Sequence, residues 1–516
     1  MRALILLLGL YSAPLAAAPS RKARLPAGLV IASVTIDARN VFETDAPPEN
    51  KLLYRAANRA HIRTRDHVVE RELLFAAGER YDPLLIEETE RNLRALPFIR
   101  RAEVIAVVNK KGAVDVTVRT FDAWTLEVVA GFKRAGGVTN VKGGFAENNI
   151  LGQGKAASAV YSRDGDSVSR AFSYKDRQFM RRQRLQLALA AASAPGSRNY
   201  SIGVDRPFYA SIARTAYGGG FTYGESRLAE LTRRTGELSA SFGVALATST
   251  ERTRRVTFGL ATRRSASDGA NPDVEQLTFF KLAGDWQEID FITARRIQAF
   301  TRDEDFNLGL GVFPSLAWAP RSAALGSTAS QILPRVDATK GFAWTSHLLL
   351  LKSGYRSRYV NGNNGGRVAS FEASHFARGL PYQTLAFHAA LDLGWQLDGE
   401  GQLGLGELNG LRGYGLNRFT GSRRFLYNIE DRVYVWDNLF RMLDVGAVAF
   451  YDSGYAWPEG SSVNLADLRS SVGLGLRAAP SRSGSNSPVR VDLAFPVSRR
   501  TSLSSWSLSI LAGQAF

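Results

Sequence analysis

The chain has 516 residues, which is room for about two or three domains, and no cysteine, which excludes a disulfide framework and a thiolate metal site. Lys and Arg give a formal net charge of +17 but are spread along the chain without a zinc-finger spacing, an RNP-type motif or a basic heptad, so nucleic-acid binding is not expected. Beyond the N-terminus no apolar run approaches the roughly 18 residues of a membrane helix. Strands that alternate apolar and polar residues can span a bilayer at the hydrophobic content of 45%, because only every second residue meets lipid.

The N-terminus has the pattern of a secretory signal peptide over residues 1–18. Arg2 supplies the positive charge, Ala3–Leu10 the apolar core, and Ala16–Ala18 the small-residue cleavage region. The apolar core is too short to span a membrane, so we expect export and cleavage near residue 18. Residues 19–29 are interpreted as a basic linker that Pro and Gly interrupt.

A small α+β unit is predicted over residues 30–120. Alternating apolar residues predict a first strand at Val30–Ile36. Thr64 is expected to cap a helix that Gly78 ends, and Asp82, followed by proline, is expected to begin a second helix. Two strands are then expected to pair around the turn Asn109–Gly112.

The predicted order is β-α-α-β-β. With Gly78-Glu79-Arg80-Tyr81-Asp82 between the helices and Leu96-Pro97-Phe98-Ile99 after them, this unit resembles a single POTRA module. The resemblance implies a sheet edge that accepts an extended client strand through backbone hydrogen bonds. An unrelated small α+β domain is the alternative.

From residue 121 onward the helical periodicity disappears. Alternating segments of about ten residues are separated by turns, which is typical of membrane β-strands. Examples are Leu126–Phe132, Val138–Phe145, Lys155–Ser162, Leu185–Ala191, Glu237–Ala247 and Val256–Ala261. The last predicted strand, about 503–516, ends in Phe516 and places that residue on the same face as Trp506.

Three motifs follow one another between residues 404 and 457. A Gly-rich loop carries Leu411-Arg412-Gly413-Tyr414 and precedes two alternating segments, about 423–436 and 443–457. The first segment contains Asn428, Glu430 and Arg432, and the second contains Phe450, Asp452 and Gly454. An arginine on a loop and carboxylates on two adjacent strands can form a buried, bidentate contact.

This ordered set resembles the superfamily of outer-membrane insertases and two-partner secretion transporters. The resemblance implies a mainly β chain, in which residues 121–516 form a transmembrane antiparallel barrel of about sixteen strands behind one POTRA domain. The candidate strands slightly exceed that number, and we assign the excess to wrong strands between residues 198 and 380. Gly144–Gly154 resembles the family's turn between the second and third barrel strands.

The family's functional residues map onto the three motifs. By resemblance Arg412, Gly413 and Tyr414 form a loop tip inside the barrel, and Glu430 on the twelfth strand and Asp452 on the thirteenth bind Arg412. Gly454 belongs to the same group, and Phe516 is expected to act as a sorting signal at the end of the closing strand.

No catalytic, metal or cofactor site is expected. The five histidines (61, 67, 347, 375 and 388) are scattered, and none lies in an H-E-x-x-H motif. Gly165-Asp166-Ser167 is expected in a tight turn, and Gly152-Gln153-Gly154-Lys155 lacks the first Gly and the Ser/Thr of a phosphate-binding loop. We therefore interpret the chain as a non-enzyme.

The resemblance implies a protein of the Gram-negative outer membrane, with its POTRA domain in the periplasm, that assists the assembly, insertion or translocation of proteins. Unfolded outer-membrane or secreted clients would bind the edge strand of the POTRA sheet and the seam, which is where the first and last barrel strands meet. Outer-membrane lipid would surround the barrel. A two-partner secretion pore and a passive porin are the alternatives. The first usually carries two POTRA modules, and the second needs neither residues 30–120 nor the set around Arg412.

Overall fold

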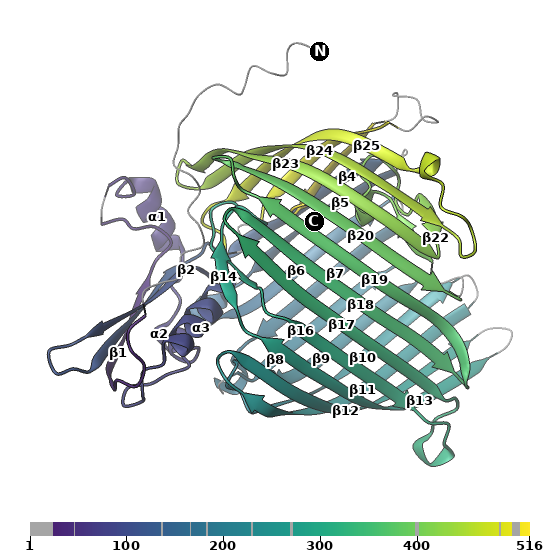
Figure 1. Ribbon diagram of the computed structural model, residues 1–516, viewed down its shortest axis with the longest axis horizontal. Coiled ribbons are helices and arrows are strands. Elements are labelled where there is room, and N and C mark those ends of the chain that lie inside the picture. The colour runs from purple at the N-terminus through teal and green to yellow at the C-terminus, as the bar shows by residue number, and fades with distance from the viewer. Residues whose placement is uncertain are drawn as a thin grey trace, which may run out of the picture.

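The computed structural model describes residues 24–516 except for short gaps at 46, 136–137, 166, 182–183, 229–230, 269–271, 398–401, 485–486 and 498–505. The predicted signal peptide and the first part of the predicted linker lie outside the described residues. The chain forms a small N-terminal unit at one end of a large barrel (Figure 1). We call the barrel end that meets this unit the near end and the opposite end the far end.

The N-terminal unit is a three-stranded sheet covered by helices. Its elements are β1 (Ile31–Arg39), α1 (Leu52–Ala60), α2 (Asp66–Glu70), α3 (Pro83–Arg94), β2 (Ile99–Val108) and β3 (Val114–Asp122). The sheet order is β1-β3-β2, with β1 parallel and β2 antiparallel to β3. Residues from β1, β2 and β3 share one buried cluster with Ile86 and Leu93 of α3, so the helix packs on the sheet.

Three details of this unit correct the sequence interpretation. The helix expected from Thr64 to Gly78 is only α2, because the chain leaves it after Glu70 and the backbone N–H of Leu74 donates to the Thr89 hydroxyl of α3. The additional helix α1 precedes it. The N-cap of α2 is Arg65 rather than the expected Thr64, and no side chain caps this helix. As expected, Asp82 caps α3 at Leu84 N and the hairpin turns at residues 109–112.

The last residues of the predicted linker are packed rather than extended. Leu25 and Leu29 contact the core of the N-terminal unit, and Arg24 forms a two-pronged ion pair with Glu87 of α3 at 2.7 and 2.8 Å. Residues 24–29 therefore belong physically to the N-terminal unit.

Within the described part of the chain, twenty antiparallel strands close into a single barrel, so the expected number of about sixteen is wrong. The first ten strands are β4 (Leu126–Ala135), β5 (Val138–Glu147), β6 (Lys155–Asp164), β7 (Ser167–Asp176), β8 (Gln186–Ala194), β9 (Ser197–Arg206), β10 (Thr215–Leu228), β11 (Leu231–Thr248), β12 (Arg252–Asp268) and β13 (Asp273–Glu288). The other ten are β16 (Gly311–Ala319), β17 (Gln331–Trp344), β18 (His347–Val360), β19 (Asn363–Ala377), β20 (Gln383–Trp395), β23 (Arg423–Leu439), β24 (Leu443–Trp457), β25 (Arg469–Pro480), β26 (Val489–Pro496) and β27 (Ser507–Ala512).

The strands that we assigned to error between residues 198 and 380 are therefore real. Fifteen strands precede the loop that carries Arg412, and five follow it. The expected turn at residues 144–154 does lie between the second and third barrel strands, β5 and β6.

Alternation along the strands gives the barrel two chemically different faces. On β24, Asp444, Val448, Phe450 and Asp452 are buried and point inward, as the sequence predicted. The outer face carries large exposed apolar side chains, among them Leu238, Leu246, Phe258, Leu474 and Leu476. An exposed apolar surface that repeats along many strands is typical of a barrel that faces lipid.

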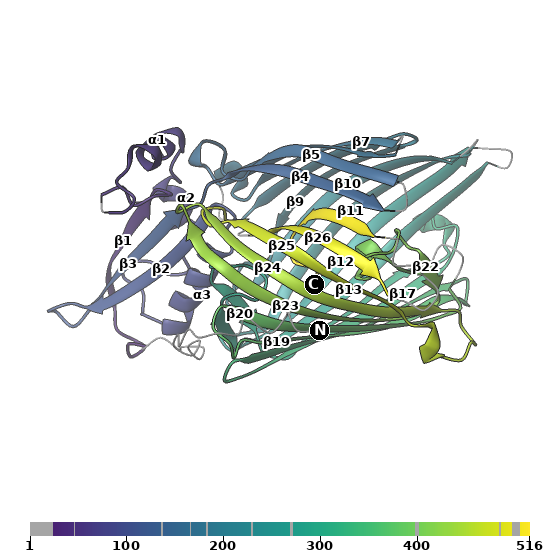
Figure 2. The same cartoon turned by 90° about the horizontal axis from the view of Figure 1, so that it is seen from above.

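The seam between the last and first barrel strands is short. The blue first strands and the yellow last strands lie side by side in Figure 2. Among the described residues, which exclude 136–137 and 498–505, β27 pairs with β4 at three positions, whereas β4 pairs with β5 at ten. The expected closing strand of about 503–516 is corrected to Ser507–Ala512. Gly513 has a φ of +89°, a left-handed conformation that ends the strand.

The chain end beyond Gly513 turns into the barrel. Phe516 packs against a buried cluster that includes Ile297, Phe376 and Ala386, and its ring stacks on His388. The expectation that Phe516 continues the outward face of the last strand with Trp506 is therefore wrong.

Two connections enter the barrel from opposite ends. The tip loop, residues 402–422 between β20 and β23, contains the short pair β21 (Leu403–Leu405) and β22 (Phe419–Gly421). The strap, residues 289–310 between β13 and β16, contains the pair β14 (Phe291–Ala294) and β15 (Glu304–Asn307). The strap lies at the near end, beside the N-terminal unit (Figure 1).

Candidate functional site

The tip loop is folded against the inner wall. Leu405, Leu411 and Tyr414 of the loop form a buried cluster with Leu426 of β23, and Leu405 and Leu411 have no measurable exposure. This apolar contact fixes the loop on the wall, and it places Arg412 among the inward charges of β23 and β24.

Arg412 is bound by both acids that the sequence assigned to it. Its Nε and Nη2 atoms donate to the two carboxylate oxygens of Asp452 at 2.7 and 2.8 Å, and its Nη1 atom donates to Glu430 at 2.7 Å. The guanidinium also lies over the ring of Phe450, 3.5 Å from the ring centre. The side chain is 1% exposed, so these contacts replace its water completely.

The acids stand on different strands from those expected. Because four further strands precede the tip loop, Glu430 lies on the sixteenth barrel strand and Asp452 on the seventeenth, rather than on the twelfth and thirteenth. Their positions on the first two strands after the loop are as expected. Asp431, which interrupts the alternation of β23, accepts a hydrogen bond from Gln383 Nε2 of β20 at 2.6 Å.

Arg412 belongs to a larger charged group, which we call the lock cluster. It consists of Arg412, Glu430, Arg432, Asp452, Arg477, Arg490 and Asp492, all of them buried. Asp492 on β26 accepts from Arg477 at 2.5 Å and lies 3.5 Å from Arg412, and Arg432 donates to Glu430 at 2.8 Å. The cluster therefore ties the tip loop to β23, β24, β25 and β26.

Sequence reasoning missed Arg477, Arg490 and Asp492 as members of this site. A usable signal was present, because Arg490 and Asp492 lie on the same face of a strand whose other face is apolar. Charged residues at successive inward positions of a membrane strand need partners inside the barrel.

Glycines provide the space that the cluster needs. A Cβ atom on Gly475 would lie 2.1 Å from a carboxylate oxygen of Asp492, and one on Gly473 would lie 2.1 Å from the Phe450 ring. A Cβ atom on Gly454 would lie 2.9 Å from the side chain of Leu405 and from the backbone oxygen of Phe425. The predicted site residue Gly454 thus allows the tip loop to approach the wall closely.

The other two residues of the predicted tip hold the loop conformation. Gly413 has a φ of +90°, and its N–H donates to the Glu407 carboxylate at 3.0 Å. The Tyr414 hydroxyl donates to the Ser470 carbonyl of β25 at 2.9 Å. Glu407 also accepts from the Ser507 hydroxyl of β27 at 3.3 Å, so the tip loop contacts the strand that forms the seam.

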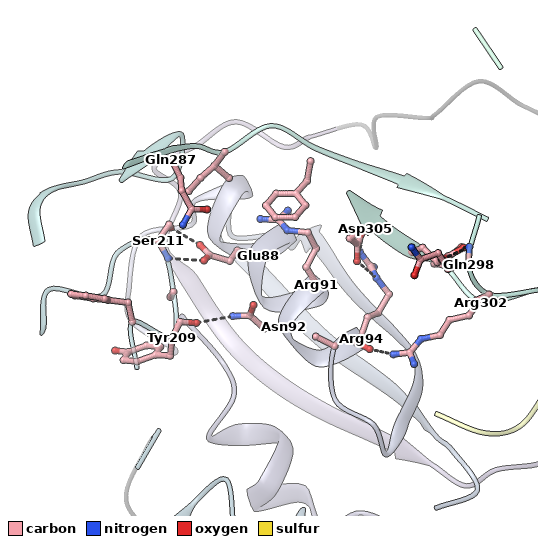
Figure 3. A pocket seen from close by; sticks show the side chains of 18 of the residues that line it. Glu88, Arg91, Asn92, Arg94, Tyr209, Ser211, Gln287, Gln298, Arg302 and Asp305 are labelled. Atoms are coloured by element: carbon pink, nitrogen blue, oxygen red, sulfur yellow. Dashed lines mark hydrogen bonds and ion pairs between the residues drawn. The ribbon is translucent and has the colours of Figure 1, made fainter. Parts of the chain in front are cut away.

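A second site of polar contacts lies at the near end, where α3 faces the barrel. A cavity of about 620 Å³ separates α3 from the strap and from the turn 207–214 (Figure 3). Glu88 accepts from the Ser211 N–H and hydroxyl at 2.7 and 2.5 Å, and Arg94 binds both carboxylate oxygens of Asp305 at 2.8 and 3.0 Å. These contacts dock the N-terminal unit on the barrel.

The rejected enzyme motifs lie where the sequence placed them. Gly165 lies between β6 and β7, and Asp166 is outside the described residues. His347 and His375 stack on each other beside Trp344. Within the described ranges, no three His, Asp or Glu side chains are grouped closely enough to hold a metal ion. Among these same residues, no helix is both long and apolar enough to cross a bilayer.

Comparison with known proteins gives matches among solved structures alone. No family model matches the chain, and no curated protein does. CdiB from Escherichia coli is 12% identical with a TM-score of 0.46, covering 96% of this chain and 93% of that one. CdiB from Acinetobacter baumannii is 10% identical with a TM-score of 0.43, covering 94% and 74%. BamA from Haemophilus ducreyi, in a form lacking POTRA domains 1–3, is 13% identical with a TM-score of 0.38, covering 94% and 85%. Likeness of this degree identifies no activity.

Proposed function

We propose that the chain is an outer-membrane barrel that assists the assembly, insertion or translocation of other proteins. In this proposal residues 1–18 are a signal peptide, residues 30–120 a POTRA domain in the periplasm, and residues 121–516 the barrel in lipid. Residues 19–29 are the segment between signal peptide and domain, and its last residues, 24–29, pack on the domain. The apolar outer face supports the membrane location, because a water-exposed surface of that extent is rare in soluble monomers.

The observation that carries the proposal is the placement of the lock cluster beside a short seam. The cluster ties the tip loop to four of the last five strands, and Glu407 of the tip loop binds the fifth through Ser507. The seam itself has three paired positions. Contacts with the tip loop hold β23 to β27 together, so the wall can open at its weak junction, between β27 and β4. An extended client segment can then add to the exposed edge of β4 by backbone pairing.

A passive porin gains nothing from these features. Both the tip loop and the strap occupy the inside of the barrel, and α3 is docked at the near end. A secretion pore for one exoprotein remains the alternative, and it uses the lumen rather than the seam. The two functions therefore differ in which part of the barrel must move.

A disulfide across the seam separates them. Phe132 and Ile510 are paired across β4 and β27, and the chain has no cysteine of its own, so Phe132→Cys with Ile510→Cys places one removable bond there. We expect oxidised cells to lose outer-membrane proteins from the membrane fraction, and reduction to restore them. The control is Leu474→Cys with Leu493→Cys, a paired position on β25 and β26 away from the seam. Normal protein assembly with the seam fully crosslinked would contradict the proposal.

A further inference from the structure

The strap is held by the barrel wall on one side. The Ile297 carbonyl accepts from Arg432 of β23 at 2.6 Å, and the Arg296 carbonyl accepts from the Tyr434 hydroxyl at 2.8 Å. Phe300, which is 1% exposed, meets the Tyr434 ring edge-on at 5.0 Å. These contacts reach across the inside of the barrel, because the strap leaves the wall between β13 and β16 and is bound at β23.

On its other side the strap is held by α3. The Arg94–Asp305 pair is two-pronged, and its side chains are 9% and 15% exposed. Arg302 of the strap donates to the Arg94 carbonyl, and the guanidinium of Arg91 lies over the Phe291 ring at 4.4 Å (Figure 3). The strap thus joins the N-terminal unit to β23 across the inside of the barrel, in addition to the direct contacts that Glu49 makes with Arg482 and Tyr54 makes with the Phe440 carbonyl.

Arg432 connects the strap with both the chain end and the lock cluster. Its guanidinium donates to the Ile297 carbonyl, to Glu430 at 2.8 Å and to the Phe516 carbonyl at 3.4 Å, and it lies 5.0 Å from the centre of the Phe516 ring. Ile297 of the strap packs in the same apolar cluster as Phe516. The residues that follow β27 are therefore docked on a surface that the strap completes.

We propose that the strap controls the seam and is itself controlled by α3. While Arg94 holds Asp305, the strap keeps Ile297 against Phe516 and Arg432, and the docked chain end holds β27 in place beside β4. When α3 leaves Asp305, the strap loosens, the chain end undocks and the three-position seam opens. This inference rests on the proposed function and adds its regulation: movement of the N-terminal unit, as when it binds a client, is transmitted to the seam.

The test uses a single cysteine at Ser509 as a reporter of the seam. Ser509 is 1% exposed and lies on β27 opposite β4, and the chain has no other thiol. The rate at which Ser509→Cys reacts with a water-soluble maleimide is measured in the full chain in lipid vesicles. Because Ser509 lies on the buried inner face of β27, labelling needs β27 or the groups docked beside it to move, and the rate follows the fraction of molecules in which they have moved.

We expect Asp305→Ala and Arg94→Ala each to raise the labelling rate by about tenfold, and the double variant to match either single one, because both remove the same pair. Tyr434→Phe, which removes only the hydroxyl bound to Arg296, should raise the rate by a smaller factor. The matched control is Glu87→Ala, which breaks the Arg24 ion pair on a face of α3 that the strap does not touch. Heat-modifiable migration on gels establishes that each barrel is folded.

Unchanged labelling in folded Asp305→Ala and Tyr434→Phe would overturn the inference, as would an equal rise in Glu87→Ala. Its failure is distinguishable from failure of the proposed function. If strap variants raise labelling but a crosslinked seam leaves protein assembly normal, the coupling stands and the function is wrong. If the crosslinked seam blocks assembly but strap variants have no effect, the function stands and the coupling is wrong.

Discussion

Each charged side chain of the lock cluster around Arg412 depends on its partners to remain buried. An isolated guanidinium or carboxylate inside a protein is strongly unfavourable, so such groups persist only when their partners satisfy them. Asp452 binds Arg412 with both oxygens, and Asn428 donates to the same carboxylate at 2.7 Å. Asp492 adds a link to Arg477 at 2.5 Å. Glu430 and Asp492 each have further arginine partners, whereas Asp452 forms its ion pair with Arg412.

Arg412→Ala tests this directly. We expect a loss of about 3–5 kcal/mol of barrel stability, because Asp452 remains buried without the arginine that binds both of its oxygens, while Glu430 keeps its contact with Arg432. The measurement is the fraction of heat-modifiable barrel after urea titration in detergent. Arg418→Ala, which removes an exposed arginine from the same loop, is the control and should change little. Equal stability of the two variants would show that the lock cluster does not hold the wall.

A second prediction concerns Asp122, which lies outside the barrel strands at the end of β3. Burial raises the pKa of this carboxyl to about 7, although the Thr64 N–H donates to it at 2.6 Å. His61, 3.9 Å away, supplies no compensating charge at neutral pH, because burial lowers its pKa. The folded unit therefore prefers the neutral carboxyl. The part of the folding stability that depends on the neutral Asp122 carboxyl is fully present below the pKa of this group in the unfolded chain, about 3.9. It is lost as the pH rises through about 7.

Asp122→Asn should consequently stabilise the N-terminal unit at about pH 8, by up to about 4 kcal/mol, and should have no such effect near pH 4. Hydrogen exchange of the peptide that covers β3, compared between the two proteins at each pH, measures this difference. Slower exchange of the natural protein than of the variant at the higher pH would contradict it.

At the scale of elements, the strap and the chain end share one apolar surface. Phe300 is wedged beside Tyr434, and a Cβ atom on the neighbouring Gly446 would lie 3.0 Å from its ring. Ile297 has no exposed surface. The position of a 22-residue connection is thus determined by a few buried side chains rather than by sheet hydrogen bonds to the barrel.

Phe300→Ala is expected to release the strap. Truncating a buried phenylalanine lowers the folding stability by about 3–5 kcal/mol, which exceeds the stability expected of a two-stranded hairpin of this size. Limited proteolysis should then cut within residues 295–303, a segment with three arginines. Leu310→Ala, at an exposed position of the same connection, should leave the strap protected. Identical cleavage of both variants would contradict the packing argument.

The elements show where sequence reasoning succeeds. Segments 423–436 and 443–457 are predictable because lipid and lumen impose a strict period of two, and β23 and β24 follow it. The Arg412 contact is predictable because its residues form an ordered motif. The alternation also indicated the additional strands, but we preferred the strand number that the family resemblance implies to the number counted along the chain. The strap and the turn at Gly513 are set by contacts distant in sequence, which no local pattern records.

At the scale of the whole molecule, three parts meet inside one closed wall. The tip loop enters at the far end, and the strap enters at the near end together with the last residues of the chain. The N-terminal unit docks outside through α3 and through contacts of Glu49, Tyr54 and Glu72 with barrel turns. Among the described residues, each barrel strand pairs with a neighbour on both sides, and the pairing is shortest at the seam. A closed wall of paired strands meets the condition that a bilayer sets for any structure that spans it.

The most direct measurement is the environment of one outward residue on a barrel strand. Leu474 on β25 is 68% exposed, and a spin label attached to Leu474→Cys in vesicles reports which quencher reaches it. Val463, in the connection after β24, is 58% exposed and provides the aqueous control as Val463→Cys. The account predicts that oxygen, but not a water-soluble nickel chelate, reaches the label at Leu474, and that the chelate reaches the one at Val463. Free access of the chelate to Leu474 would show that the outer face meets water and would contradict the membrane barrel.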